Sequence, residues 1–165
     1  MRDFSKKIAR AGVIAGIYVA LTFVTMPIAS GTIQIRIAEA MTLLPLLFIE
    51  AVPALFIGCM LANLITGCAL QDVVFGSLIT LLAGISTYIT GKLIKKTWIK
   101  LVVGGLFPVL LNAFFLPIIW YYCYGELEYL YYIQVLFMLA GQGISVYAFG
   151  VLLYLKLKKW QEKSK

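Results

Sequence analysis

Hydrophobic positions along the chain form long runs that short groups of charged residues separate. Uncharged stretches extend over residues 11–35, 51–71, 73–91, 101–125 and 129–155. Since about 20 predominantly apolar residues span a bilayer as an α-helix, each of these five stretches is long enough to cross a membrane. The pattern predicts an all-α membrane protein, and we expect the first stretch to be a retained span rather than a cleaved signal peptide.

Residues 37–49 form a shorter apolar run that Glu39 interrupts. Lysine and arginine gather near the N-terminus, between Lys92 and Lys100, and near the C-terminus, and Arg36 is the one basic residue outside these groups. Short loops rich in Lys and Arg stay cytoplasmic, so the chain must cross the membrane an even number of times before Lys92. The short run must supply one of those crossings. We predict a bundle of six transmembrane helices with both termini cytoplasmic, at approximately residues 8–28, 36–50, 52–68, 72–92, 100–120 and 128–157.

The composition supports this class. Of the 165 residues, 62% are hydrophobic and 13% are charged, there is no histidine, and the net charge is +7. A soluble domain is typically about 45–50% apolar and about 25% charged. Attraction of basic residues to anionic inner-leaflet lipid, about 1 kcal/mol each, accounts for the positive charge. We therefore expect one domain over residues 1–165, in contact with the lipid bilayer and without a nucleic-acid partner.

Gln34, Arg36 and Glu39 place polar groups at the start of the short run. A helix over residues 36–49 reaches only about 21 Å against a hydrocarbon core of about 30 Å, which draws these groups toward the outer half of the membrane. A charge costs about 2.5 to 3.5 kcal/mol at mid-bilayer, so both should face a protein interior or a wet cavity. Two interpretations stay open: Arg36 and Glu39 neutralise each other as a structural pair, or they form a ligand site.

Polar residues of the other predicted spans also lie at middle or outer depth. Each has a structural explanation: Asn63 and Asn112 can join helices by hydrogen bonds, and Gln142 can serve close helix packing. Trp120 can belong to an interfacial aromatic belt. Together they indicate a pocket for a small, polar, flat molecule that opens to the outside. The candidate substrate-binding residues are Gln34, Arg36, Glu39, Asn63, Asp72, Asn112, Trp120, Glu126 and Gln142.

Motifs for ATP hydrolysis or catalysis are missing from the sequence. The nearest match to a phosphate-binding loop, residues 90–93, lacks its final Ser/Thr and its first glycine. The three cysteines have no paired spacing, and no acid, base and nucleophile fall together. We predict no catalytic residue, no metal and no cofactor. A small membrane enzyme that uses Glu39 and Asp72 as acid and base, and a purely structural subunit, are the alternatives.

Three segments carry a resemblance to a known family: residues 33–45 (IQIRIAEAMTLLP), 53–63 (PALFIGCMLAN) and 72–83 (DVVFGSLITLLA). They resemble the QueT family, the substrate-capture subunits (S-components) of energy-coupling factor (ECF) transporters for queuosine precursors. The resemblance covers essentially the whole chain. It implies a six-helix protein of the bacterial plasma membrane that binds a 7-deazaguanine base from outside, and we expect the aminomethyl form; another small vitamin-like substrate is the alternative.

The resemblance also implies partners and roles. A transmembrane coupling protein and two ATPase subunits would supply energy, and an Ala-x-x-x-Ala pattern, matched by Ala11 and Ala15, would meet the coupling protein. Small residues at this spacing also suit packing within the bundle. The loop near residues 26–35 would act as a lid. Glu39 would accept adjacent N–H donors of the base; Asp72 or Glu126 would meet the aminomethyl cation.

Overall fold

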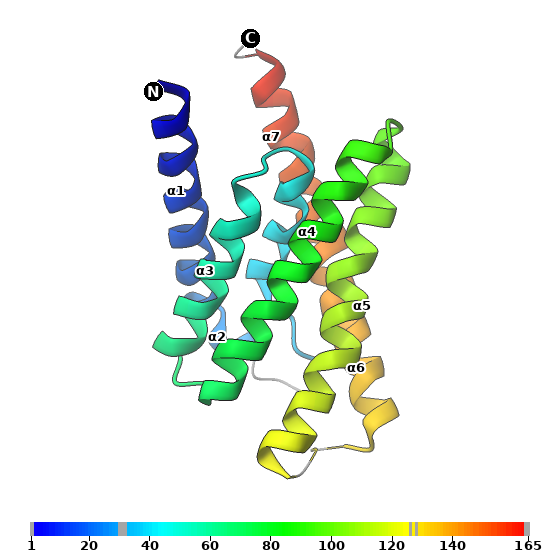
Figure 1. Ribbon diagram of the computed structural model, residues 1–165. Helices are drawn as coiled ribbons and strands as arrows, with labels where there is room; N and C mark the ends of the chain where they lie inside the picture. The colour runs from blue at the N-terminus through cyan, green and yellow to red at the C-terminus, as the bar shows by residue number, and fades with distance from the viewer. Residues whose placement is uncertain (1, 30–32, 126, 128, 164–165) are drawn as a thin grey trace.

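Helices account for the regular structure of the described chain, and the described residues include no strand. The computed structural model describes residues 2–29, 33–125, 127 and 129–163 (Figure 1). In chain order the elements are α1 (Arg2–Val24), α2 (Met26–Ala29), the 3-10 helix η1 (Ile37–Leu46), α3 (Ala51–Ile65), the π-helix η2 (Asp72–Gly76), α4 (Ser77–Leu93), α5 (Thr97–Tyr124), α6 (Tyr131–Gly143), the π-helix η3 (Ile144–Gly150) and α7 (Val151–Lys163). The predicted all-α class is confirmed.

Four helical stretches of the described residues are long and apolar enough to cross a membrane: Asp3–Val24, Asp72–Leu93, Thr97–Cys123 and Tyr131–Lys163. Two shorter apolar helices, Ile37–Leu46 and Ala51–Ile65, lie where the other two spans are predicted. The outer surfaces of the long stretches are apolar, with large side chains such as Leu136 of α6 and Phe115 of α5 exposed. The chain is a membrane protein; the exact number of six crossings stays a prediction.

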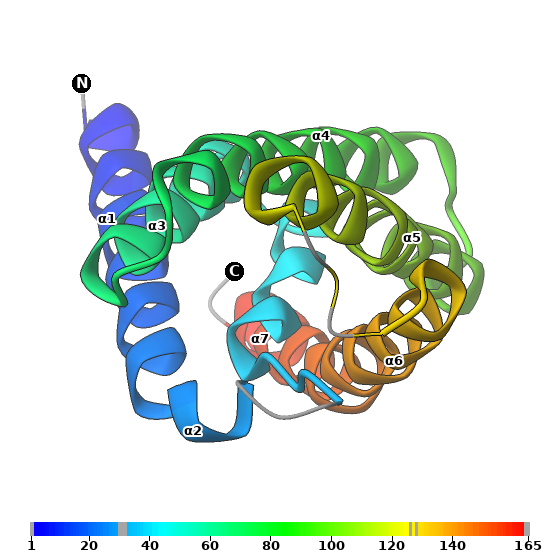
Figure 2. The ribbon, with the colours of Figure 1, turned by 90° about the horizontal axis from the view of Figure 1, so that it is seen from below.

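The short run around Glu39 differs in conformation from the expected α-helix. It forms the 3-10 helix η1, which rises about 2.0 Å per residue and so extends its ten residues to about 20 Å. Residues 38–45 of η1 are all buried. Viewed from below, η1 lies inside a ring that α1, α3, α4, α5, α6 and α7 form around it (Figure 2). The element that carries Glu39 is therefore enclosed by protein.

Apolar clusters hold η1 to the surrounding helices. On one side Met41 belongs to a buried cluster with Ile14 of α1 and Leu55 of α3, and on another Leu43 packs with Val146 of η3. Lipid tails are as apolar as leucine, so inside a bilayer these contacts stabilise the fold through close packing rather than through removal from water. The shape of the enclosed segment is thereby fixed by its neighbours.

Helix α5 runs further than predicted, to Tyr124, and continues through Pro108 and Pro117. Prolines are tolerated within membrane helices because neighbouring groups satisfy the freed backbone carbonyls. The helix ends at Gly125, whose φ of 78° lies in the left-handed region that favours glycine. The extra turn, residues 121–124, continues past Trp120 at the end of the bundle opposite the termini (Figure 1).

The two chain ends and the connection between α4 and α5 lie at the same end of the bundle (Figure 1). These three regions carry all the basic groups of the sequence except Arg36. The bundle therefore has one strongly basic end, and the opposite end lacks these basic residues. Its cytoplasmic orientation, and that of both termini, stays a prediction.

Candidate functional site

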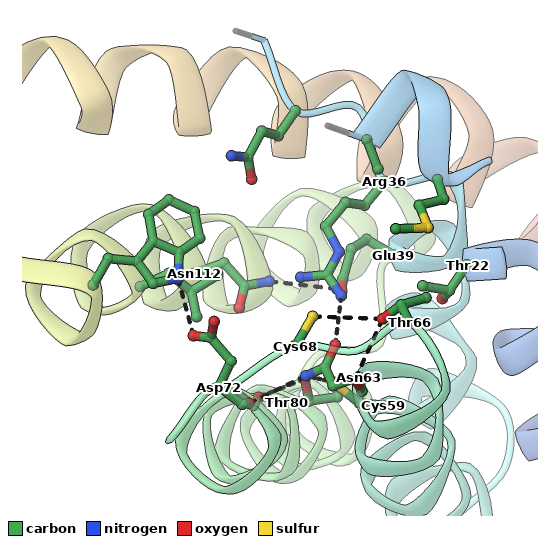
Figure 3. Close-up of a pocket in the computed structure, with 16 residues that line it drawn as sticks. Thr22, Arg36, Glu39, Cys59, Asn63, Thr66, Cys68, Asp72, Thr80 and Asn112 are labelled. Carbon is green, nitrogen blue, oxygen red and sulfur yellow. Dashed lines mark hydrogen bonds between the residues drawn. The ribbon is translucent and has the colours of Figure 1, made fainter. Parts of the chain in front are cut away.

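A cavity of about 160 Å³ lies in the half of the bundle away from the chain ends. Side chains from α1, η1, α3, η2, α4 and α5 line it, so residues far apart in sequence meet there (Figure 3). Seven of the nine candidate substrate-binding residues lie in its wall: Gln34, Arg36, Glu39, Asn63, Asp72, Asn112 and Trp120. Of the other two, Gln142 lies behind the wall, and Glu126 falls outside the described residues.

Glu39 is the buried carboxylate of this cavity. It follows the extended backbone of Arg36 into the first turn of η1, and only 1% of its surface is exposed. Its Oε1 accepts a hydrogen bond of 2.7 Å from the Tyr18 hydroxyl of α1, and its Oε2 accepts one of 3.4 Å from Asn112 Nδ2 of α5. An ionised carboxylate has about four acceptor positions, so these two bonds leave about two for a ligand.

Arg36 extends into the cavity beside Glu39 (Figure 3). Its Nη2 donates a 3.4 Å hydrogen bond to Asn63 Oδ1 of α3. Within the described part of the chain, Arg36 and Glu39 form no ion pair with each other. Each charge is held by a hydrogen bond to a separate neighbour, so the structural-pair interpretation does not rest on a direct contact and both interpretations stay open. Most of the five guanidinium N–H groups stay available to a ligand.

Asn63, Asp72 and Trp120 form a second linked group on the cavity wall. Asn63 Nδ2 donates to the backbone carbonyl of Asp72 at 3.1 Å and lies 3.7 Å from the sulfur of Cys59. The indole Nε1 of Trp120 donates to Asp72 Oδ1 at 2.9 Å. Asn63 does join helices, as its structural explanation requires, and it also faces the cavity. The Trp120 ring is held at the cavity rather than left free at an interface.

Gln142 supports the wall from behind. It is fully buried, and its Oε1 accepts a 3.3 Å hydrogen bond from Asn112 Nδ2, the same amide that reaches Glu39. Within the described residues its Nε2 is buried without a hydrogen-bond partner. Gln142 thus contributes to the position of Asn112 and keeps one unused donor.

The segment that carries Gln34 lies directly on helix α6. A Cβ atom added at Gly141 would fall well inside van der Waals contact of the Gln34 carbonyl oxygen and close to its amide nitrogen. Glycine is therefore required there, because it lets the two backbones approach. The preceding residues 30–32 of the predicted lid lie outside the described part of the chain.

Sequence reasoning missed several residues of the candidate site: Tyr18, which bonds to Glu39 from outside the cavity lining, and others that line the cavity. Tyr18 is the most important, since it is fully buried and bonded to Glu39. A buried tyrosine hydroxyl usually has a hydrogen-bond partner, so a tyrosine in the middle of the first span is a usable signal. Thr22 of α1, Thr80 of α4 and Cys68 line the cavity. They carry no distinct pattern in the sequence.

The candidate partner-binding residues Ala11 and Ala15 lie on α1, where each is half-buried against the apolar cluster shared with α3. Ala15 lies close to Gly58 of α3, so the two helices approach tightly there. Gly12 and Gly16, one position along, are exposed, and no atom lies within 4 Å of a Cβ built on either. The open small-residue face of α1 is therefore the glycine face.

The described residues include no group of three or more His, Cys, Asp or Glu that could hold a metal ion. Comparison with known proteins gives one family finding: a model described as the QueT transporter matches residues 8–159. No curated protein and no solved structure matches the chain. The matched range contains the cavity and every element that lines it.

Proposed function

The chain belongs to the QueT transporter family, and from this premise we propose that it captures a queuosine precursor, a 7-deazaguanine base, at the cavity around Glu39. It is a membrane-bound transporter component for a small-molecule substrate and not an enzyme, so the membrane-enzyme alternative is excluded.

The observation that carries the substrate proposal is the buried Glu39 carboxylate with about two unused acceptor positions. A guanine-like edge presents adjacent N–H donors that one carboxylate accepts as a pair, and such charge-assisted pairs are strong and directional. Arg36 has no direct bond to Glu39, so we assign its guanidinium to the carbonyl oxygen of the base. Glu39 and Arg36 then bind neighbouring atoms on one edge of the base.

The cavity size supports a base rather than a nucleoside. Pockets for drug-sized ligands enclose about 300–1,000 Å³, whereas this cavity encloses about 160 Å³. Asn63 and Asn112 complete the edge contacts, Gln142 supports Asn112, and Trp120 supplies a ring for stacking. We assign the aminomethyl cation of the substrate to Asp72, which lines the cavity, or to Glu126.

For transport, we place the basic end of the bundle in the cytoplasm of a bacterial cell, with six crossings and the cavity toward the outside. Binding alone cannot drive accumulation, so a transmembrane coupling protein and two ATPases of the ECF type supply the energy. The open glycine face of α1, Gly12 and Gly16, meets the coupling protein, while the predicted Ala11 and Ala15 beside it pack inward against α3. Capture and transport are then separate steps.

Calorimetry with purified Glu39→Gln protein tests the proposal. We expect the affinity for 7-aminomethyl-7-deazaguanine to fall roughly 100-fold, since hydrogen bonds to charged groups contribute about 1.5–3 kcal/mol. Glu162→Gln, at an exposed residue paired with Lys158, is the matched control and should bind normally. Unchanged affinity of Glu39→Gln would remove Glu39 from the site.

A competition panel of purines, deazapurines and pyridines tests the substrate class with the wild-type protein. Preference for a compound other than a deazaguanine would assign the cavity to another vitamin-like substrate. Failure to bind any member would favour a structural subunit whose polar groups only join helices.

A further inference from the structure

A second cavity, of about 310 Å³, lies at the basic end of the bundle. The first helix, the turn between η1 and α3, the end of α4 and the end of α7 all contribute to it. These parts lie at the end of the bundle where α1 begins and α7 ends (Figure 1). Its charged residues are Lys7, Arg10, Glu50 and Lys92, and Gln161 adds an amide. None of these residues lines the cavity around Glu39.

Arg10 is held in place within this second cavity. Its Nη1 donates to Glu50 Oε1 at 2.6 Å, and its guanidinium carbon lies 4.4 Å from the centre of the Phe48 ring. The Glu50 side chain is 9% exposed and Phe48 is buried, so the partners of Arg10 are themselves fixed. A guanidinium has five N–H donors in a rigid fork, and the Glu50 contact leaves several for another anion.

The cavity carries excess positive charge. Lys7 and Lys92 come from α1 and α4, and in the described part of the chain neither forms an ion pair. Lys92 lies 5.5 Å from the centre of the Tyr88 ring, which keeps it at the cavity wall. Glu50 balances only one of the three cations. Two positive charges therefore face the cavity without a compensating carboxylate.

Exposed apolar side chains lie next in sequence to the charged residues of this cavity, and one of them lines it. Ile8 follows Lys7, Leu93 follows Lys92, and Ile49 lines the cavity beside Glu50; their exposed fractions are 56%, 77% and 50%. A polar, positively charged recess beside an apolar outer surface matches a molecule with an anionic head and hydrocarbon chains. A soluble phosphate would use only the recess.

We infer that this second cavity is a binding site for the phosphate headgroup of an anionic phospholipid, with Lys7, Arg10 and Lys92 as the contacts. The inference rests on the proposed cytoplasmic orientation of the basic end. Basic pockets between transmembrane helices on that side are suited to anionic headgroups. Bound lipid would neutralise the excess charge and fix α1 to α4 at this end of the bundle.

Native mass spectrometry of the purified full-length chain tests this site. Phosphatidylglycerol and phosphatidylcholine with identical acyl chains are titrated in parallel, and the wild type should bind the first phosphatidylglycerol with clear preference. The double variant Lys7→Gln/Lys92→Gln should lower that affinity roughly 30-fold, a factor of about five for each lysine. The matched control is Lys95→Gln/Lys96→Gln, at exposed basic residues of the same end that do not line the cavity; it should keep the preference.

Four outcomes would overturn the lipid assignment. An equal loss of lipid affinity in both double variants would indicate diffuse electrostatic attraction, and displacement of the lipid by equimolar glycerol phosphate would indicate a free-phosphate site. Equal binding of phosphatidylglycerol and phosphatidylcholine by the wild type would also contradict the assignment. Unchanged lipid binding by Lys7→Gln/Lys92→Gln together with lost assembly onto the coupling module would indicate a protein partner. Deazaguanine binding is measured on the same samples. A protein that prefers phosphatidylglycerol but binds no deazaguanine would refute the substrate proposal alone.

Discussion

The hydroxyl of Tyr18 donates a 2.7 Å hydrogen bond to Oε1 of Glu39, and this bond joins the first helix to the enclosed 3-10 helix. Tyr18 is fully buried, and its Cβ also marks the close approach of α1 to Gly58 of α3. One residue of α1, the helix that carries the open glycine face, thus contacts both the candidate ligand-binding carboxylate and α3.

We expect Tyr18→Phe to weaken deazaguanine binding about tenfold. The substitution removes a donor to a buried carboxylate, a contact worth about 1.5–3 kcal/mol, and leaves Glu39 less precisely placed. Calorimetry measures the change in Kd. Tyr147→Phe is the matched control, because it also removes a hydroxyl hydrogen bond, to the Val102 carbonyl at 2.8 Å, but lies away from the cavity. Equal losses in the two variants would contradict a specific role for Tyr18.

Gly141→Ala should lower ligand affinity about tenfold. The added methyl group would overlap the Gln34 backbone, and such overpacking costs about 1–3 kcal/mol, so the segment that carries Gln34 and Arg36 must move. Gly143→Ala, at a site where a Cβ meets no atom within 4 Å, is the control. Binding and thermal unfolding are measured together. Full affinity in Gly141→Ala would show that the segment does not contribute to the site.

Cys68 offers a direct probe of cavity occupancy, because it is exposed and lines the cavity, whereas Cys59 is buried. In a Cys123→Ser background, a maleimide should modify Cys68. Ligand at ten times its Kd should slow the reaction roughly tenfold by mass action. The converse protein, Cys68→Ser, reports on Cys123, which does not line the cavity. Its labelling rate should not change with ligand, and protection there would indicate a global effect.

Larger side chains should have different effects on the two small-residue faces of α1, the packed alanine face and the open glycine face. Ala15→Leu would overpack the tight contact with Gly58, so we expect destabilisation of about 1–3 kcal/mol and weaker ligand binding. Gly16→Leu faces open space and should leave binding intact. With the coupling module present, uptake should fall in Gly16→Leu. Normal uptake in that variant would place the partner on another surface.

Much of the architecture was predictable because charges are costly in lipid. The uncharged stretches located the helices, and the isolated position of Arg36 and Glu39 pointed to an enclosed polar region. The family resemblance is confirmed over residues 8–159. The convergence of Asn63, Asp72 and Asn112 on the same cavity followed from their similar predicted depths.

Other features depend on contacts that a sequence pattern does not contain. An apolar run such as residues 37–46 predicts an α-helix, because 3-10 runs of more than three or four residues are uncommon, and no pattern in the sequence indicates the ten-residue 3-10 helix that forms. The requirement for glycine at Gly141 comes from a backbone more than a hundred positions away. The partner of Tyr18 likewise belongs to a different element.

The ring of helices around η1 has a further consequence for how the protein behaves in membranes of different thickness. The outer helices can adapt to a change in bilayer thickness by tilting, which costs fractions of a kcal/mol per Å of hydrophobic mismatch. The inner segment has no lipid-facing side along residues 38–45, so it experiences that change only through its protein neighbours. If Glu39 binds the solute as proposed, its position depends on bilayer thickness only through the surrounding helices.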